Sequence, residues 1–328
     1  MSRLVTIYGG SGFVGRYIAR RMAKAGWRVK VAVRRPNEAL FVQTYGVVGQ
    51  VEPVLCNIRD DASVRAAMHG ADAVVNCVGI LNNLGRNRFD AVQHDGAERV
   101  ARIAGVQGVK RLVHLSAIGA DKNSESEYAR TKALGEEAVM TYFPGAVILR
   151  PSVVFGTEDH FFNRFANMTN YSLVLPLVGG NTLFQPVYVD DVAAAAEVAL
   201  TENVTPGIFE LGGPEVDTLK GLVHFMLRVI ERRRLVLNLP FWVGSVMGFG
   251  FDMMQAVTGG LIPNRILTRD QVRMLKYDNV VSENARGLTD LGISPTPYES
   301  VVPEYLWRFR PSGEFAAIKD SAKKLRNT

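Results

Sequence analysis

Short β-branched runs alternate with helical patterns along the first 150 residues of the chain. Six of these runs predict strands, at Leu4–Tyr8, Arg28–Val33, Glu52–Leu55, Ala73–Cys77, Arg111–Leu115 and Ala146–Leu149. Four segments between them predict helices, at Val14–Ala25, Ser63–His69, Ala91–Ala104 and Ser126–Tyr142. Strands that alternate with helices are typical of βαβ units, so the pattern predicts an α/β fold with a parallel sheet.

The second half of the chain has a more mixed pattern. Pro186–Val192 predicts a short strand with Asp190-Asp191 as the cap of a helix over Val192–Leu200. A strand is predicted at Ile208–Gly213 and an amphipathic helix at Leu219–Arg232. We therefore expect one domain over residues 1–155 and a smaller mixed α/β lobe over residues 156–328.

The stretch Leu239–Phe251 is apolar or glycine apart from Ser245. At 13 residues it is shorter than the roughly 18 that a membrane-spanning helix needs. It is either a core helix of the smaller lobe or a segment that docks on a membrane or a partner, about residues 235–280. The docking interpretation is favoured by arginines on both sides, at Arg232, Arg233, Arg234, Arg265, Arg269 and Arg273.

The net charge of +6 is unevenly distributed over the 328 residues. Residues 1–150 hold 21 lysines and arginines against 13 acidic residues, and the remainder holds 17 against 19. A basic first half fits an anionic ligand, an acidic partner or a negatively charged membrane. Since no basic stripe interleaved with aromatic residues recurs, we expect no nucleic-acid partner.

The two cysteines, Cys56 and Cys77, lie in apolar runs and are expected to be buried free thiols in a reducing compartment. The three histidines considered as ligands have no metal-ligand spacing, so no metal is predicted; they are His94, His114 and His224. The first strand begins almost at Met1, and no targeting segment is expected. The chain is accordingly interpreted as bacterial and cytoplasmic, or as a mature processed form.

A glycine-rich turn, Gly9–Gly15, joins the first predicted strand to the first helix. Glycines at 9, 12 and 15 allow a tight turn and close approach of a pyrophosphate, which the helix N-terminus attracts through free N–H groups. In this strand–turn–helix context the motif predicts dinucleotide binding on a doubly wound, Rossmann-type sheet. The second strand ends in Arg34 and Arg35 where an NAD site has an acidic residue, so NADPH is the predicted cofactor.

Further candidate residues follow later strands. Asn57 and Ile58 are expected to border the adenine, and Cys77, Val78 and Gly79 the path of the ribose and nicotinamide. Tyr128 and Lys132 lie on one face of a helix, 12 residues after Ser116. Lys132 would hold the ribose and lower the pKa of the Tyr128 phenol, which would exchange a proton with a substrate carbonyl or hydroxyl.

Together these residues resemble the extended and atypical short-chain dehydrogenase/reductase families, in which they occur in the same order. In those families a proline-containing segment, here Leu149–Gly156 with Pro151 and Val153, closes over the nicotinamide. Gln93 stands where many members have asparagine, and this departure affects the usual proton relay.

Three segments are similar to one subfamily, the thirty-nine-kilodalton type of nucleotide-binding accessory subunit of respiratory complex I. They are Tyr128–Glu136, Arg150–Ala166 and Gln185–Val192, and the likeness covers most of residues 1–230. The resemblance implies a structural NADPH and docking beside the quinone-binding region at the membrane surface, without substrate turnover. It assigns cofactor contacts to Gly9, Ser11, Gly12, Phe13, Gly15, Arg34, Ser116, Tyr128, Lys132 and Pro151.

Two hypotheses therefore remain. The first is a non-catalytic NADPH-binding accessory subunit of a membrane-bound NADH:ubiquinone oxidoreductase, with other complex I subunits and the lipid surface as partners. It would be peripheral on the cytoplasmic face of a bacterial inner membrane, or on the matrix face in a mitochondrion. The alternative is a free NADPH-dependent reductase or epimerase acting on a quinone precursor or a sugar nucleotide, with Ser116, Tyr128 and Lys132 as its catalytic residues.

Overall fold

Seven parallel strands form the main sheet in the computed structural model, which describes residues 3–258, 261, 264, 267–311 and 313. The strand order is β11-β6-β5-β4-β1-β2-β3. Each neighbouring pair is parallel, with Leu4 of β1 opposite Arg28 of β2. The strands are β1 (Leu4–Tyr8), β2 (Arg28–Val33), β3 (Val51–Leu55), β4 (Ala73–Asn76), β5 (Arg111–Leu115), β6 (Val147–Pro151) and β11 (Gly207–Leu211).

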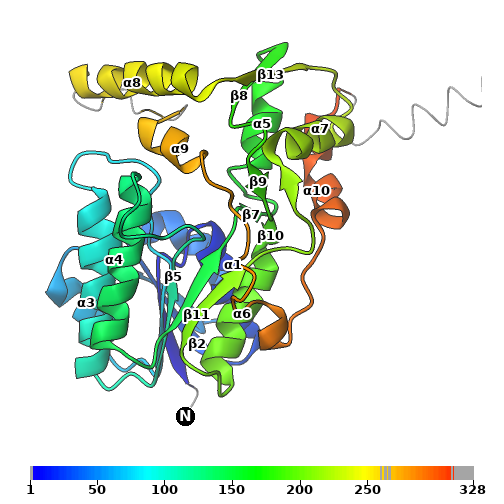
Figure 1. The fold of residues 1–328 in the computed structure, drawn as a ribbon. Coiled ribbons are helices and arrows are strands. Elements are labelled where there is room, and N and C mark those ends of the chain that lie inside the picture. Colours follow the sequence, from blue (N-terminus) through cyan, green and yellow to red (C-terminus); the bar gives the residue numbers. More distant parts are fainter. Residues whose placement is uncertain (1–2, 259–260, 262–263, 265–266, 312, 314–328) are drawn as a thin grey trace, which may run out of the picture.

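Helices cover both faces of this sheet, as the doubly wound prediction requires (Figure 1). One face packs against α1 (Phe13–Lys24) and α6 (Val189–Thr201), through a core that includes Ile18 and Val192. The other face packs against α2 (Asp61–Met68), α3 (Asp95–Val106) and α4 (Glu127–Tyr142). The 3-10 segment η1 (Pro36–Tyr45) follows β2.

The helix predicted over Ala91–Ala104 begins with a wider turn. Residues Asp90–His94 form the π-helical segment η2, and α3 continues from Asp95. A Cβ on Gly135 of α4 would clash with the Gln93 carbonyl oxygen, so α4 and η2 approach each other closely only because residue 135 is glycine. Gln93 is held by two hydrogen bonds, from its amide to the Ile80 carbonyl and from the Thr131 hydroxyl to its side-chain oxygen.

The sheet is not confined to residues 1–155. The chain leaves it after β6 and returns with α6 and then β11, which pairs with β6 from Gly207 opposite Val147. The predicted aspartate cap of α6 is wrong, because Tyr188 is the N-cap residue and Asp190 and Asp191 lie in the first turn. Asp190 pairs with Arg21 of α1 at 2.7 Å, and Asp191 accepts hydrogen bonds from Thr296.

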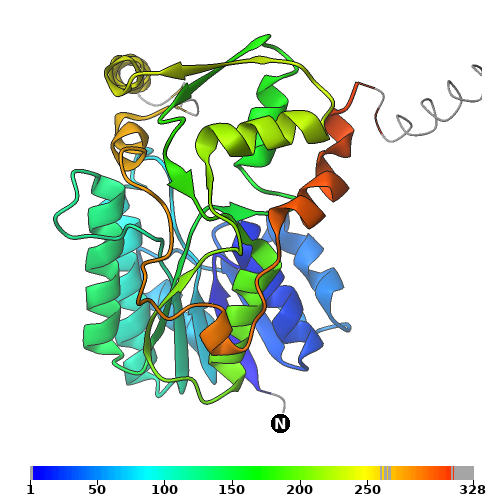
Figure 2. The same cartoon turned by 45° about the vertical axis from the view of Figure 1, so that its right-hand side comes forward.

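A smaller mixed α/β lobe lies above the carboxyl ends of the main strands (Figures 1 and 2). Its core contains Phe162, Leu175, Met226 and Val302. Its strands are β7 (Val154–Phe155), β8 (Val174–Val178), β9 (Leu183–Phe184), β10 (Val187–Tyr188), β12 (Asp217–Thr218) and β13 (Leu235–Leu239). Its helices are α5 (Phe162–Met168), α7 (Leu219–Val229), α8 (Phe241–Val257), α9 (Arg269–Met274) and α10 (Tyr298–Leu306), with the 3-10 turn η4 (Trp307–Phe309). The 3-10 turn η3 (Thr289–Leu291) packs instead against α6 of the main domain.

Helix α8 contains the apolar stretch singled out in the sequence, and Figure 1 shows it at the edge of the molecule with α9 beneath it. Within the part of the chain that the structure describes, no helix has the length and apolar character needed to cross a membrane. Of the flanking arginines, Arg265 lies outside the described residues. Arg232 and Arg234 donate to the Thr169 carbonyl at the C-terminal end of α5, so they stabilise the lobe itself.

Candidate functional site

The glycine turn lies directly between β1 and α1. Gly9 has a φ of +74°, which favours glycine, and a Cβ on Gly15 would lie 2.5 Å from the Gly9 carbonyl oxygen. Gly12 is the N-cap residue of α1, so no side chain caps the helix, and its first turn has no acidic residue. The N-terminus of α1 is therefore open to an anion, as the motif predicts.

Arg16 borders this turn and was not among the predicted residues. Its guanidinium donates to the carbonyl oxygens of Ser11 and Gly12, at 3.1 and 3.4 Å, and pairs with Glu158 at 3.3 Å. A cation one turn into the helix, beside Ser11, adds positive charge where a pyrophosphate would approach. The sequence could have indicated Arg16, because a basic residue directly after the last glycine of the turn lies in the first turn of the helix.

Arg34 and Arg35 differ in their surroundings at the end of β2. Both are exposed, but Arg35 pairs with Glu38 at 3.0 Å. The expectation that no carboxylate lies near these arginines is wrong, because Glu38 pairs with Arg35. Arg34 has no ion pair within the described residues, so it is the better candidate for a 2′-phosphate.

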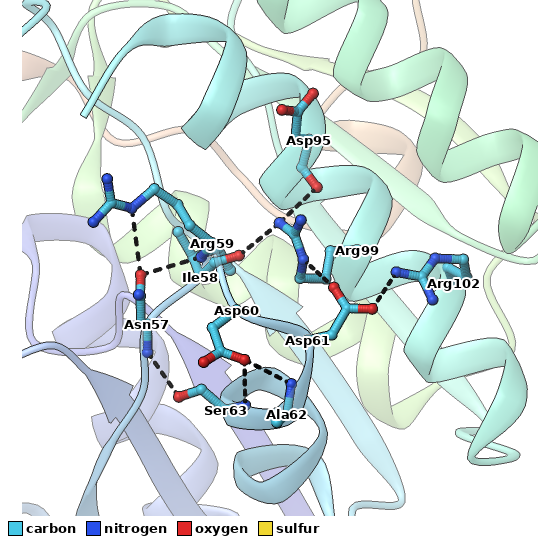
Figure 3. Close-up of polar contacts among 10 residues, drawn as sticks. All are labelled: Asn57, Ile58, Arg59, Asp60, Asp61, Ala62, Ser63, Asp95, Arg99 and Arg102. Atoms are coloured by element: carbon cyan, nitrogen blue, oxygen red, sulfur yellow. Dashed lines mark hydrogen bonds and ion pairs between the residues drawn. The ribbon is translucent and has the colours of Figure 1, made fainter. Parts of the chain in front are cut away.

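The segment predicted to border an adenine is held by its own hydrogen bonds (Figure 3). The Asn57 amide nitrogen donates to the Ser63 hydroxyl at 2.9 Å, and the Asn57 side-chain oxygen accepts from the Arg59 amide. The Ile58 carbonyl accepts from Arg99, which also pairs with Asp61. Asp60 caps α2 through the amides of residues 62 and 63. This network fixes the backbone at Asn57 and Ile58 at the end of β3.

Residues 77–79 follow β4 and lie against the glycine turn. The Cys77 amide donates to the Tyr8 carbonyl at 2.9 Å, and a Cβ on Gly9 would lie 3.3 Å from the Cys77 carbonyl group. The Val78 amide donates to the Asn76 side-chain oxygen. A Cβ on Gly79 would lie 3.5 Å from the Lys132 ammonium nitrogen. Both cysteines are free, and burial raises the pKa of Cys56 to about 11 and that of Cys77 to about 12.

Ser116 and Lys132 face the same place at the end of β5. The Ser116 hydroxyl is buried without a hydrogen-bond partner among the described residues. The Lys132 ammonium donates to the Leu115 carbonyl at 3.0 Å, and burial lowers its pKa to about 8. Neighbouring His114 binds the Asn76 amide through Nδ1, and burial together with Lys132 lowers its pKa to about 3, so His114 is neutral.

The Tyr128 phenol does not have the lowered pKa that the sequence analysis expected. Burial raises its pKa to about 12, and the Asp270 carboxylate adds to the shift. The Tyr128 ring packs edge-on against Phe89 with centroids 5.9 Å apart. Lys132 does not lower this pKa, because its ammonium donates to the Leu115 carbonyl while the Asp270 carboxylate accepts from the Tyr128 amide.

Pro151 and Val153 lie at the end of β6, where Asn279 joins the two lobes. The Asn279 side-chain oxygen accepts from the Val153 amide at 3.1 Å and from the Ser152 hydroxyl at 2.7 Å. The Ile118 amide donates to the Pro151 carbonyl. Asn279 was not predicted, because a contact over 126 residues leaves no local signal in the sequence.

These side chains all follow carboxyl ends of parallel strands, so they share one edge of the sheet, where α/β proteins bind nucleotides. The structure brings together the residues after β1, β4, β5 and β6, and Arg34 and Asn57–Ile58 follow β2 and β3 at the same edge. An open helix N-terminus, an unpartnered buried hydroxyl and a buried ammonium fit a dinucleotide. No group of three or more histidine, cysteine or acidic side chains is arranged for a metal within the described residues.

A cavity of about 640 Å³ adjoins this edge and extends into the smaller lobe. Tyr128, Pro151 and Val153 line it at the sheet, and Met247 of α8 lines it in the lobe. Its lining residues come from both parts of the chain.

The outer face of α8 is largely exposed among the described residues, with Arg269 stacked on the Phe249 ring. Trp242 is 70% exposed, Val246 64% and Phe249 47%. The opposite side packs closely, since Cβ atoms on Gly244 and Gly248 would clash with Val178 and with the backbone at 268–269. Two of the glycines in this helix thus serve contacts within the chain.

A family model described as the NAD dependent epimerase/dehydratase family matches residues 5–212. Among curated proteins, the Arabidopsis thaliana mitochondrial NADH dehydrogenase (ubiquinone) 1 alpha subcomplex subunit 9 is 34% identical over 94% of this chain and 79% of its own length. The Neurospora crassa mitochondrial NADH-ubiquinone oxidoreductase 40 kDa subunit is 30% identical over 98% of this chain and 83% of its own. Among solved structures, the UDP-glucose 4-epimerase of Thermus thermophilus in complex with NAD shares the fold, with a TM-score of 0.61, 21% identity, and coverage of 72% of this chain and 86% of that one.

Proposed function

Because the chain belongs to the NAD dependent epimerase/dehydratase family and to the family of the mitochondrial subunit 9 proteins, we propose that it is an NADPH-holding accessory subunit of a membrane-bound NADH:ubiquinone oxidoreductase, complex I. It lies peripherally on the cytoplasmic face of a bacterial inner membrane, or on the matrix face in a mitochondrion. Its partners are other complex I subunits near the quinone-binding region and the lipid surface. It holds its nucleotide without turning over a substrate.

The choice of NADPH is supported by charge at the end of β2. Arg34 has no ion pair among the described residues and is free to form a bidentate contact with a 2′-phosphate. At the other end of the site, Ser116 and Lys132 offer a hydroxyl and an ammonium to the ribose and nicotinamide. When bound, NADPH would supply a hydride donor, and the role of these residues is to hold and orient it.

The absence of turnover is supported by Tyr128. A general acid works best when its pKa lies near the operating pH, and the pKa of this phenol is raised to about 12. The carboxylate of Asp270, whose oxygen accepts from the Tyr128 amide at 3.1 Å, opposes ionisation of the ring. The pair suits binding better than proton transfer.

The observation that carries the docking role is the uncovered apolar face of α8. Exposed aromatic and aliphatic side chains along one helix face mark a surface that buries itself against a partner or lipid. Arg269, stacked 5.4 Å from the Phe249 ring, adds positive charge at this face. Such a combination suits an anionic lipid surface.

The experiment is affinity purification of the tagged chain in mild detergent, comparing the wild type with a Val246→Glu/Phe249→Glu double variant. We expect the wild type to migrate with the quinone-reducing assembly and the double variant to migrate alone, with NADPH still bound. Val106→Glu is the control, since Val106 is an exposed apolar residue at the end of α3, away from α8. Equal comigration of the double variant and the wild type would contradict the docking role.

The alternative function is a free NADPH-dependent reductase or epimerase acting on a quinone precursor or a sugar nucleotide. It is favoured by the unpartnered Ser116 hydroxyl, close in sequence and space to the Lys132 contact at Leu115. In that case Ser116, Tyr128 and Lys132 would be catalytic, and Tyr128→Phe would abolish a measurable NADPH-dependent reduction. For the accessory subunit, Tyr128→Phe leaves quinone reduction by the parent complex nearly unchanged.

A further inference from the structure

The cavity beside Tyr128 has the size of a small-molecule site. Its volume of about 640 Å³ falls within the range of roughly 300–1,000 Å³ that such sites occupy. It begins at the carboxyl edge of the sheet and ends beneath α8, because both Tyr128 and Met247 line it. None of the residues of the glycine turn lines it. The cavity is therefore a space separate from the pyrophosphate end of the nucleotide site.

Its walls in the smaller lobe are aliphatic and aromatic. They come from α5, α7, α8 and α9 and from β8, β9 and β13, with Phe165, Met168, Leu177, Leu239, Met247 and Met274 as representative side chains. Methionine side chains are flexible and polarisable, so they adapt to an apolar ligand without a fixed shape. This lining favours a chain of methylene or methyl-branched units.

The charges on the lining oppose an anionic ligand. Four carboxylates line the cavity, at Asp121, Glu125, Asp270 and Asp278. Among the described lining residues the basic side chains are Arg164 and His160. A nucleotide diphosphate bound here would meet an excess of negative charge, which disfavours it. The acidic lining thus opposes an anionic ligand, and the apolar walls favour one without charge in the smaller lobe.

Helix α8 connects the cavity to the exposed apolar face. Met247 lines the cavity while Val246, the residue before it, is 64% exposed. Gly244 brings the helix against Val178, another lining residue, because a side chain at 244 would clash there. One helix thus forms both the roof of the cavity and an apolar outer surface.

From this geometry we propose that the cavity binds the aliphatic chain of a membrane lipid, which enters beneath α8 and extends toward Tyr128. The proposal does not rest on the proposed function, since its apolar walls lie in the smaller lobe. The cavity shares Tyr128, Pro151 and Val153 with the nucleotide site, so lipid binding is measured with NADPH bound and nucleotide binding is measured separately.

The test uses the full-length protein saturated with NADPH and measures equilibrium binding of tritiated dodecanol, with farnesol and UDP-glucose as competitors. We expect saturable binding of one alcohol per protein molecule. Farnesol displaces it if the natural lipid chain is an isoprenoid, and UDP-glucose does not displace it. Binding of either alcohol supports the proposal, and the alcohol that binds more tightly identifies the type of lipid chain. Displacement of dodecanol by UDP-glucose, or the lack of saturable binding, would overturn it.

Variants locate the site. Met274→Trp fills the cavity and is expected to weaken dodecanol binding at least tenfold, whereas Met253→Trp, on the exposed face of α8, leaves it unchanged. Equal weakening by both would mean adsorption to the outer surface and would overturn the proposal. Should Met274→Trp fail to fold, as judged by its melting temperature, Met247→Ala replaces it. That variant enlarges the cavity and should shift the preference severalfold from dodecanol toward hexadecanol, and an unchanged preference counts against the site.

Discussion

The Asp270 carboxylate accepts a hydrogen bond from the Ser126 hydroxyl at 2.7 Å, although 144 residues separate the two. The same carboxylate accepts from the Glu127 amide at 2.7 Å, so α9 caps the N-terminus of α4 (Figure 1). Helix α4 holds Tyr128 and Lys132, and α9 packs beneath α8. Through one carboxylate, α9 therefore joins the exposed apolar helix α8 to α4, which carries Tyr128 and Lys132.

Replacing Asp270 tests this connection. Asp270→Ala removes the acceptor for two backbone amides and one hydroxyl, and is expected to lower the free energy of unfolding by about 1–2 kcal/mol. Urea denaturation measures the change. Glu283→Ala, at an exposed acidic residue in the segment beside β11, is the control and should alter stability by less than about 0.5 kcal/mol. A cost no larger than that of the control would mean that the cap does not stabilise α4.

The two arginines after β2 give a matched pair for nucleotide choice. Arg34→Asp should weaken NADPH binding about ten- to a hundredfold, because one charge-assisted contact is worth about 1.5–3 kcal/mol. Arg35→Asp should weaken it less, since Arg35 already pairs with Glu38. Titration of both variants with NADPH and NADH measures the difference. Unchanged preference for NADPH in the Arg34 variant would refute its assignment to the 2′-phosphate.

The glycine turn predicts a clear contrast between two glycine substitutions. Gly15→Ala places a Cβ 2.5 Å from the Gly9 oxygen and 2.8 Å from the Gly10 Cα, both backbone atoms, so the turn must shift. We expect it to cost about 1–3 kcal/mol of stability and to reduce NADPH affinity more than tenfold. Gly250→Ala in α8 meets nothing within 4 Å and should stabilise the helix by about 0.5–1 kcal/mol. Calorimetry measures stability, and titration measures NADPH affinity. This interpretation of the turn fails if the Gly15 and Gly250 variants have equal stability and equal NADPH affinity.

Lys132 makes stability depend on pH in a defined window. Burial lowers its pKa from 10.5 to about 8, so above pH 8 the folded protein has released a proton that the unfolded chain keeps up to about 10.5. The contribution of Lys132 to stability therefore rises with pH across this window, by on the order of 3 kcal/mol. Lys132→Met removes this contribution, and the difference between wild type and variant in unfolding of the nucleotide-free proteins at fixed pH values measures it. Parallel curves for wild type and variant would contradict a buried ammonium.

Local patterns were sufficient for six strands of the main sheet and for the carboxyl ends of β1, β2, β3 and β5. Three predicted strands have the observed bounds, since alternation of β-branched residues with turn residues marks them directly. The Gly9–Gly15 turn could be predicted from its sequence, because its close backbone contacts leave room only for glycine at position 15. Candidates that follow directly on strand ends, such as Arg34 and Ser116, were therefore found at the right edge.

Long-range contacts were not predictable from local patterns. Pairing of β11 with β6, the Asn279 contacts with Val153 and the Asp270 cap of α4 all join segments far apart in sequence. The pKa of Tyr128 is raised mainly by burial and further by Asp270, so the direction expected from the spacing to Lys132 alone was wrong. The start of α6 at Val189 likewise depends on Arg21 and Thr296, which engage the two aspartates.

The most direct measurement of the central claim is mass spectrometry of the nucleotide bound to the native assembly. The assembly is isolated in mild detergent by a tag on this chain, and its NADH:quinone turnover is measured with the Tyr128→Phe variant alongside. We expect one NADPH per chain in a quinone-reducing complex whose turnover the variant leaves nearly unchanged. Recovery of the chain as a small oligomer that oxidises NADPH, with Tyr128→Phe abolishing that activity, would contradict it.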